Sequence, residues 1–166
     1  VKRFMQEAMA AGLKIGVCTT SNEEAARTLT TQILKDIKFE VVLAGDIVKK
    51  KKPDPEIYNL ALEKTGLKPN ECLVIEDSRN GVLAAKAAGM FVVATTNPYT
   101  EKEDLHEADL IVTCLGDPDG EKGKLKQGGD GLAYDGVLHV DQMVKYFAAK
   151  YPNNFAHVSC TAPVVE

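Results

Sequence analysis

The sequence lacks the features that mark several common classes of protein. Acidic residues outnumber basic ones, 24 to 20, so the chain has no overall positive field of the kind that attracts nucleic acid regardless of its sequence. It contains no apolar run of about 18 residues and no secretion-signal pattern. We therefore expect no nucleic-acid partner, no membrane contact, and an intracellular location in the cytoplasm or the plastid stroma.

Cysteine is scarce, and its spacing excludes a common kind of metal site. Cys18, Cys72 and Cys114 lie in or beside apolar runs, and no two of the four cysteines have the Cys-x-x-Cys spacing typical of zinc sites. Buried reduced thiols are the expected state. The first predicted strand is also not followed by Gly-x-Gly-x-x-Gly, which argues against a dinucleotide-binding oxidoreductase.

The chain does contain an alternation of apolar strands and amphipathic helices. Its 166 residues, 45% of them hydrophobic, suffice for one core of ordinary size. Strands that alternate with helices predict right-handed βαβ units and a parallel sheet, and continuous apolar strands predict helices on both faces. Strands are predicted at 13–18, 39–44, 73–75, 91–95 and 110–112, and helices at 1–12, 23–34, 53–62, 79–88 and about 140–149, with a short helix after Thr100.

The composition divides the chain into four parts. Residues 1–115 form the predicted α/β core, and residues 116–131, rich in Gly, Asp and Lys, form a predicted exposed loop. Residues 132–151 hold the last helix, which we expect to dock on the core, and residues 152–166 are a tail without a structural signal. The chain opens inside an amphipathic helix without a start methionine, so we expect that an N-terminal portion of the native protein is missing.

Three polar groups follow the predicted strands: residues 19–22 (Thr-Thr-Ser-Asn), residues 49–53 and the pair Glu76-Asp77. In an open parallel sheet, ligands bind at the carboxyl ends of the strands. Hydroxyls and free N–H groups at a helix start suit phosphate oxygens, and a lysine stabilises a phosphoryl group. Paired carboxylates suit Mg²⁺. Together the three groups favour a site for phosphate and metal.

Each group also has an ordinary structural interpretation. Ser21-x-x-Glu24 matches a capping box, and four successive lysines can form a solvated turn. The two acids can cap the helix that begins near Arg79. Their occurrence together at one predicted edge makes the binding site the better interpretation.

Residues 15–25, 44–62 and 72–90 resemble the haloacid dehalogenase-like superfamily, most closely its β-phosphoglucomutase-like branch and the CbbY-like sugar phosphatases within it. The resemblance covers about residues 1–115. It implies a Rossmann-like parallel sheet with helices on both faces, and Mg²⁺ as cofactor. It implies catalytic roles for Thr19 and Lys52, phosphate or substrate binding by Thr20, Ser21 and Asn22, and a metal site at Glu76 and Asp77.

The chain departs from the family pattern at the first motif. Asp-x-Asp-Gly supplies the family's nucleophile and general acid/base, and it does not precede the other motifs here. The implied first strand, in the sheet centre between strands 13–18 and 73–75, and most of the helical cap are likewise missing. We therefore expect exposed edges on those strands and an inactive fragment that needs the missing N-terminal segment. The stretch 132–138 superficially echoes the motif, with Ala133 in the nucleophile's place, but a polar turn before the last helix is its ordinary interpretation.

The resemblance implies a Mg²⁺-dependent phosphatase that acts on a phosphorylated sugar through an aspartyl-phosphate, formed on an Asp outside this chain. Pentulose bisphosphates, such as xylulose or ribulose 1,5-bisphosphate, are the implied substrates. Two alternatives stay open: a β-phosphoglucomutase-type phosphotransferase, and a non-catalytic module that binds phosphate or a partner protein.

Overall fold

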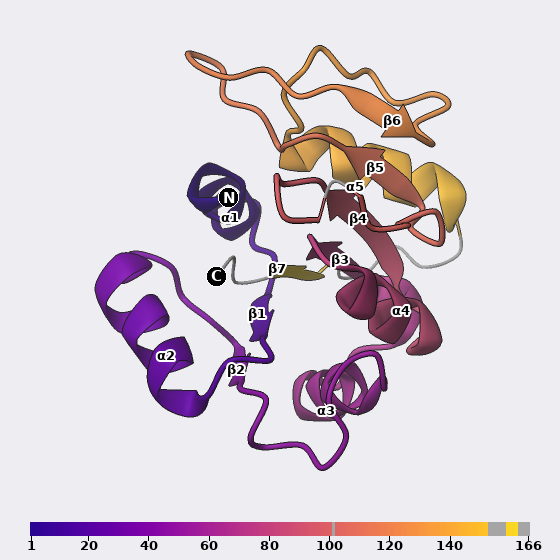
Figure 1. Cartoon of the computed structure of the whole chain (residues 1–166). Coiled ribbons are helices and arrows are strands. Elements are labelled where there is room, and N and C mark those ends of the chain that lie inside the picture. Colours follow the sequence, from indigo (N-terminus) through magenta and orange to yellow (C-terminus); the bar gives the residue numbers. More distant parts are fainter. Residues whose placement is uncertain (101, 153–158, 163–166) are drawn as a thin grey trace.

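The computed structural model of the chain describes residues 1–100, 102–152 and 159–162, and it forms an open α/β sheet (Figure 1). No helix in this described part is long and apolar enough to cross a membrane. The helices are α1 (Lys2–Ala10), α2 (Glu23–Thr28, continued by a π-helical turn at Leu29–Ile33), α3 (Glu56–Thr65), α4 (Arg79–Ala87), α5 (Val140–Lys150) and a 3-10 turn at Pro69–Glu71. The strands are β1 (Ile15–Cys18), β2 (Val41–Leu43), β3 (Cys72–Glu76), β4 (Phe91–Thr95), β5 (Leu110–Val112), β6 (Leu125–Gln127) and β7 (Ser159–Ala162).

The strands lie side by side in the order β2-β1-β7-β3-β4-β5-β6. All neighbours pair in parallel except β6, which runs antiparallel to β5 at one edge. The predicted Rossmann-like sheet is confirmed, and β4 and β5 occupy the residues predicted for them.

Two hydrophobic clusters, one on each face of the sheet, explain why the strands are continuously apolar. Successive residues of β3 point to opposite faces, so Leu73 and Ile75 join one cluster while Cys72 and Val74 join the other. Helices α1 and α5 contribute to the first cluster, and α3 and α4 to the second. Figure 1 shows α3 and α4 together on one side of the sheet. A strand covered on both faces gains from apolar residues at every position.

Strand β7 lies inside the sheet between β1 and β3, and this corrects an expectation. The sequence analysis predicted open edges on β1 and β3 and found no structural signal in the tail. In the structure, β7 pairs in parallel with both strands, with Cys160 in register with Ile15 on one side and Leu73 on the other. Unpaired backbone groups at two adjacent edges are costly, and a strand between them satisfies both. The rest of the tail, residues 153–158 and 163–166, lies outside the described residues.

Two other predicted segments differ from the structure. The predicted loop 116–131 contains β6, whose Gln127 side-chain amide donates to the Ala108 carbonyl at 2.8 Å. The short helix predicted after Thr100 is a turn in the described residues, where the Glu103 N–H donates to the Thr100 carbonyl. The side-chain carboxylate of Glu103 accepts from another part of the chain, the Arg79 N–H.

A half-buried cluster of Arg3, Glu7 and His139 joins α1 to the start of α5. The Glu7 carboxylate accepts from the Val140 N–H at 2.9 Å and from the Arg3 guanidinium, and it lies 3.0 Å from His139 Nδ1. Arg3 also donates to the Leu138 carbonyl at 2.8 Å. Burial raises the pKa of Glu7, but these hydrogen bonds outweigh it, so the pKa lies below its usual range.

Glu7→Gln is expected to lower the free energy of unfolding by about 1.5 kcal/mol near pH 7, because charge-assisted hydrogen bonds are lost. A carboxylate with a depressed pKa stabilises the fold above its unfolded-state pKa, and this contribution disappears as the pH falls through the folded-state value. The difference between wild type and variant should therefore shrink below about pH 4. Urea unfolding at several pH values measures it. The exposed Glu63→Gln serves as control, and an equal difference at every pH would contradict the assignment.

Candidate functional site

Lys52 joins the carboxyl ends of β1 and β3. Its ammonium group donates to the Cys18 carbonyl at 2.9 Å and pairs with Glu76 Oε1 at 2.5 Å. The side chains of Lys52 and Glu76 are 6% and 2% exposed, so the ion pair is screened from water. A paired charge is the form in which a lysine is stable in such a place.

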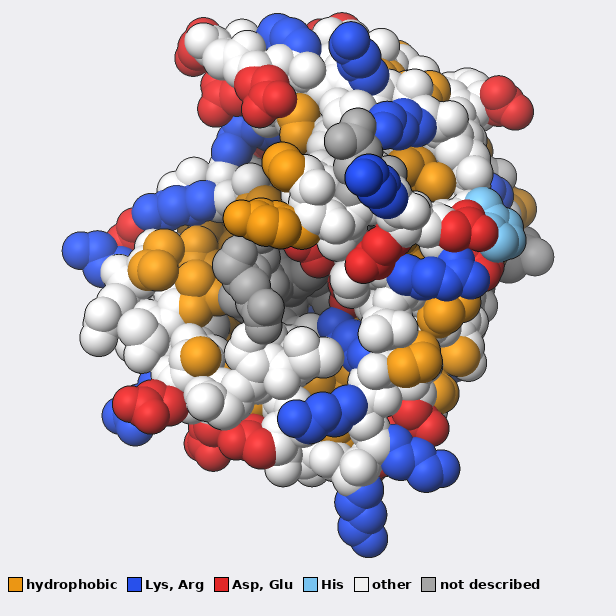
Figure 2. Space-filling model, viewed as in Figure 1, with side chains coloured by type: hydrophobic (Ala, Val, Ile, Leu, Met, Phe, Trp, Pro, Cys, Tyr) orange, Lys and Arg blue, Asp and Glu red, His pale blue; other side chains and the backbone are white. Residues whose placement is uncertain are grey.

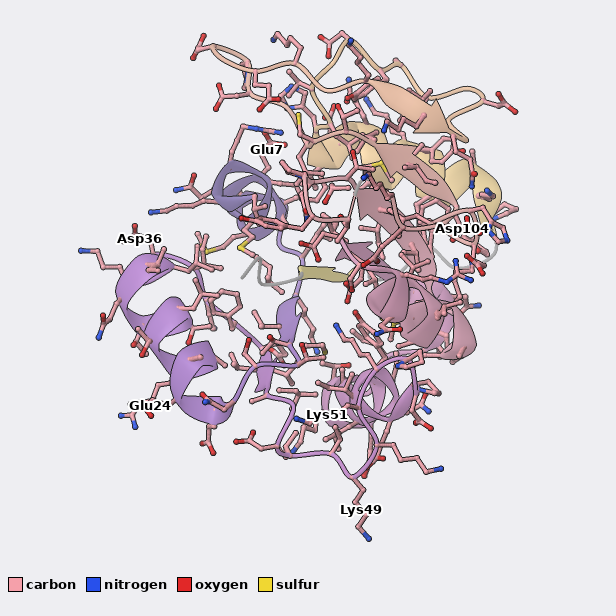
Figure 3. The ribbon with its side chains drawn as sticks, in the orientation of Figure 1. Glu7, Glu24, Asp36, Lys49, Lys51 and Asp104 are labelled. Atoms are coloured by element: carbon pink, nitrogen blue, oxygen red, sulfur yellow. The ribbon has the colours of Figure 1, made fainter. Side chains whose placement is uncertain are left out.

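The other lysines of the run behave as a solvated turn. Lys49, Lys50 and Lys51 are exposed, and Figure 3 shows Lys49 projecting away from the body of the molecule. The backbone N–H groups of Lys49 and Lys50 donate to the Glu56 carboxylate at 3.0 and 2.9 Å. Lys49, Lys50 and Lys51 thus match the interpretation as a solvated turn, while Lys52 turns inward.

Glu76 is enclosed by two residues that the sequence analysis missed. The Tyr58 hydroxyl donates to Glu76 Oε1, and burial together with the Glu76 charge raises the pKa of Tyr58 well above its usual value. On the other side, a Cβ at Gly81 would lie 1.9 Å from Glu76 Oε2. A buried tyrosine hydroxyl needs a partner, but nothing in the sequence said which one.

Thr19 follows β1 and lies nearly buried, with 4% of its surface exposed. Its N–H donates to the Leu43 carbonyl at 3.0 Å, which ties it to β2. Its hydroxyl oxygen accepts from the Ser21 N–H at 3.1 Å. The hydroxyl hydrogen can therefore be donated to a ligand oxygen.

Asn22, rather than Ser21, caps α2. The Asn22 side-chain oxygen accepts from the Ala25 N–H at 2.8 Å, so the capping box expected from Ser21 does not form. The loop is packed closely, because a Cβ at Gly45 would lie 2.4 Å from the Thr20 carbonyl oxygen. Residues 19–22 therefore turn tightly between a strand end and a helix start, at the predicted edge.

Asp77 lies beside Glu76 but in different surroundings. It is half-buried and lines a cleft of about 350 Å³ together with Thr95, Asn97 and Thr113. Burial, and then the Glu76 charge, raises the pKa of Asp77 above its usual value. The cap of α4 is Ser78, whose hydroxyl accepts a hydrogen bond from the third residue of the helix, so the two acids are not spent on capping.

The donor set at this edge fits a hard divalent cation. Mg²⁺ prefers carboxylate oxygens and usually keeps several water molecules, which suits one acid that faces a cleft. Asp77 provides that group, while Glu76 holds the charge of Lys52 next to it. Among the described residues, another set of ligand atoms converges at Asp104, His106 and Glu107, but it is largely exposed and two of its members pair with a guanidinium.

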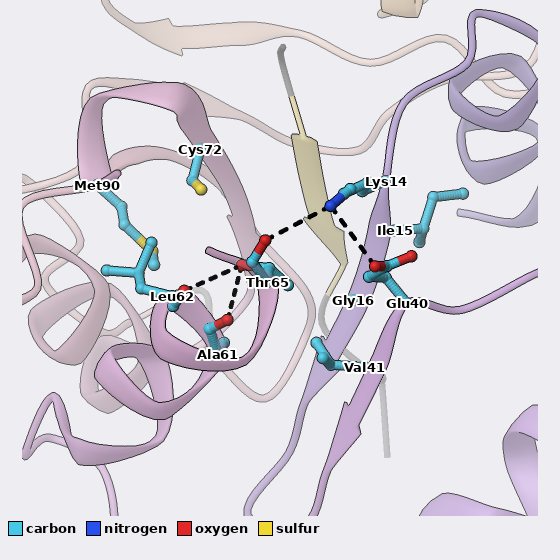
Figure 4. A pocket seen from close by; sticks show the side chains of 10 residues that line it. All are labelled: Lys14, Ile15, Gly16, Glu40, Val41, Ala61, Leu62, Thr65, Cys72 and Met90. Carbon is cyan, nitrogen blue, oxygen red and sulfur yellow. Dashed lines mark hydrogen bonds and ion pairs between the residues drawn. The ribbon is translucent and has the colours of Figure 1, made fainter. Parts of the chain in front are cut away.

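A small cavity at the opposite edge is not part of this site. It lies near the amino ends of β1, β2 and β3, where Lys14 pairs with Glu40 at 3.5 Å (Figure 4). Its volume of about 10 Å³ holds about one water molecule.

Figure 2 shows positive and negative side chains interspersed over the visible face. The positive charge of Lys52 is therefore a local feature and not part of a larger basic patch on that face.

Two strings later in the chain echo Asp-x-Asp-Gly. Residues 117–120 (Asp-Pro-Asp-Gly) match the pattern literally, which the sequence analysis did not consider; they form an exposed turn whose Asp117 lines the same cleft as Asp77. Within it, Asp117 Oδ1 accepts from the Asp119 N–H at 2.9 Å. The stretch 132–138 is the turn before α5, where Asp135 Oδ1 accepts from the Val137 N–H at 3.1 Å.

The fold is an open Rossmann-like α/β sheet. At the carboxyl ends of its strands lie the loop of residues 19–22, Lys52 and the paired acids Glu76 and Asp77. The chain belongs to the haloacid dehalogenase-like hydrolase family, whose model matches residues 1–89.

Relatives within the family include sequences and structures of the CbbY type. A CBBY-like protein of Arabidopsis thaliana is 45% identical over 124 residues, covering 74% of this chain and 39% of the relative. A crystal structure of a CbbY variant from Rhodobacter sphaeroides, in complex with xylulose 1,5-bisphosphate, is 35% identical with a TM-score of 0.62, covering 66% of this chain and 50% of that one. A β-phosphoglucomutase structure from Clostridium difficile shares the fold at 21% identity and a TM-score of 0.62, covering 91% of this chain and 56% of that one. This chain thus spans about half or less of the two CbbY-type relatives.

Proposed function

We propose that the whole protein is a Mg²⁺-dependent phosphatase that acts on a phosphorylated sugar. The observation that carries the proposal is the buried Lys52–Glu76 ion pair, which bridges the ends of β1 and β3 beside Thr19 and Asp77. A buried ion pair stabilises a protein less than well-packed apolar residues would. Its presence at a ligand-binding edge therefore favours a functional role.

Each residue has a role that its surroundings allow. The Thr19 hydroxyl and the N–H groups of Thr20 and Asn22 would bind oxygens of the phosphoryl group. The Ser21 N–H would orient Thr19 by donating to its hydroxyl oxygen. Lys52 would place a positive charge where phosphoryl charge accumulates, inside a site of low dielectric constant. Glu76 keeps Lys52 in place through its ion pair.

Asp77, with Glu76 beside it, would hold the Mg²⁺ ion. The ion supplies charge neutralisation and orientation of the phosphoryl oxygens when it is bound. In the family pattern the nucleophile is an aspartate of the first motif, which would form an aspartyl-phosphate. We propose that this aspartate belongs to an N-terminal segment outside these 166 residues, and that the present chain alone does not turn over substrate.

A pentulose bisphosphate is the proposed substrate. Support comes from the similarity to a CbbY variant crystallised with xylulose 1,5-bisphosphate. A site with separate groups for phosphoryl oxygens and for Mg²⁺ suits the transferring phosphate of such a compound. The compartment, cytoplasm or plastid stroma, stays a prediction.

The test uses the longest native form of the protein, identified by intact mass and N-terminal sequencing. We expect Mg²⁺-dependent release of inorganic phosphate from xylulose or ribulose 1,5-bisphosphate, with chelation abolishing it. Lys52→Ala and Asp77→Ala should each lower kcat/KM by at least about 100-fold, while Lys51→Ala should not. Wild-type activity in Lys52→Ala or Asp77→Ala would overturn the proposal, and transfer to a second sugar phosphate without phosphate release would indicate a phosphotransferase.

A further inference from the structure

The side chain of Asn97 is fixed at both of its ends. Its Oδ1 accepts from the N–H groups of Tyr99 and Thr100, at 2.8 and 3.0 Å. Its Nδ2 donates to Asp77 Oδ2 at 3.2 Å. One residue therefore connects the turn after β4 to the acid after β3.

The two N–H donors decide which way the amide points. If the amide were turned over, its NH₂ group would face two N–H groups and its oxygen would face a carboxylate. Both contacts would be repulsive. Asn97 must therefore present its NH₂ group to Asp77, and an aspartate at this position would present a negative oxygen instead.

A second set of contacts holds the same segment next to Asp77. The Arg79 N–H donates to Glu103 Oε2 at 2.5 Å, and its guanidinium donates to the Asp104 carbonyl and to Glu107 Oε1, the latter at 3.1 Å. The segment after β4 is thus fastened on both sides of Asp77, by Asn97 at one end and through Arg79 at the other. This makes the position of Asn97 relative to Asp77 a property of the fold.

The chemistry of the amide also matters. A lysine or arginine at this place would cancel the charge of Asp77 and compete with a cation. A neutral amide orients the Asp77 carboxylate through Oδ2 and leaves its negative charge intact. Partners of this kind commonly set the affinity of a carboxylate for a metal ion.

We propose that Asn97 is a positioning residue that holds the Asp77 carboxylate in the orientation in which it binds a divalent cation. The inference rests on the proposed function, because it takes the cation site at Asp77 as given. It adds a residue from the segment after β4, beyond the motifs that suggested the site.

The test is calorimetric titration of the 166-residue chain with MgCl₂, with no added substrate. Asn97→Ser keeps a hydroxyl that accepts from the turn N–H groups but is too short to reach Asp77. We expect its Kd for Mg²⁺ to rise by about 10-fold. Thr95→Val is the matched control, because Thr95 lines the same cleft and its replacement keeps the shape of the side chain. Its Kd should equal that of wild type.

Three outcomes separate the inference from the proposal beneath it. Weaker binding in Asn97→Ser alone, with an unchanged thermal unfolding midpoint, supports it. Equal binding in Asn97→Ser and wild type overturns the positioning role and leaves the cation site standing. No Mg²⁺ binding by wild type overturns both. If Asn97→Ser lowers the unfolding midpoint, Asn97→Thr, which also keeps an acceptor for the turn, is measured in its place with the same expected rise.

Discussion

Lys52→Ala is expected to lower the free energy of unfolding by about 3 kcal/mol, because it leaves the buried Glu76 carboxylate without its counter-charge. Glu76 is 2% exposed and cannot turn to water without moving the end of β3. The Tyr58 hydroxyl still donates to it, which keeps the loss at the lower end of the range for broken buried pairs. The effect is large for a domain of this size, since total stability is about 5 to 15 kcal/mol.

Urea unfolding at pH 7 followed by circular dichroism measures this change. Lys51→Ala is the matched control, since Lys51 is a neighbour in the same run but exposed, and its effect should stay within about 0.5 kcal/mol. Equal stabilities of Lys52→Ala and Lys51→Ala would mean that the Lys52–Glu76 pair does not form in solution.

Gly81→Ala is expected to destabilise the protein by about 2 kcal/mol, although alanine normally stabilises a helix interior by about 1 kcal/mol relative to glycine. The reversal has a local cause. The new Cβ would lie 1.9 Å from Glu76 Oε2 and 2.1 Å from its Cδ. Glu76 is held on its other side by Lys52 and Tyr58, so the carboxylate has no room to retreat.

A double-mutant cycle tests the cause. The cost of Gly81→Ala should largely disappear in a Glu76→Ala background, because the atoms that clash are gone. The same substitution is also expected to weaken Mg²⁺ binding at the adjacent Asp77. A stabilising effect of Gly81→Ala in the wild-type background would contradict the described packing of Glu76 against α4.

Local sequence patterns predicted most of the sheet. The apolar run at Phe91–Thr95 is buried on both faces. Such a run predicts a strand even when the strands beside it are unknown. The order of polar groups after the strands also placed residues 19–22, Lys52 and the two acids at one edge, because parallel strands end on the same side. The choice of Lys52 among four lysines came from the family resemblance.

The features that sequence reasoning missed depend on contacts between distant segments. Strand β7 has no distinctive pattern and is defined by the edges of β1 and β3 that it fills. Strand β6 lies in a glycine-rich stretch that pairs only because β5 offers an edge. The Tyr58 hydroxyl and the Asn97 amide acquire their roles from acids 18 and 20 residues away in the sequence. Local sequence periodicity does not predict a hydrogen bond between residues this far apart in the sequence.

Thermodynamic coupling between Mg²⁺ and inorganic phosphate in the 166-residue chain tests the central claim most directly, since it requires the metal and phosphate groups to form one site but does not require a nucleophile. If Thr19, Lys52 and Asp77 line a common site, phosphate should bind at least about 5-fold more tightly in the presence of saturating Mg²⁺. The coupling should vanish in Asp77→Ala. Phosphate binding that is indifferent to Mg²⁺, or no phosphate binding at all, would contradict the account.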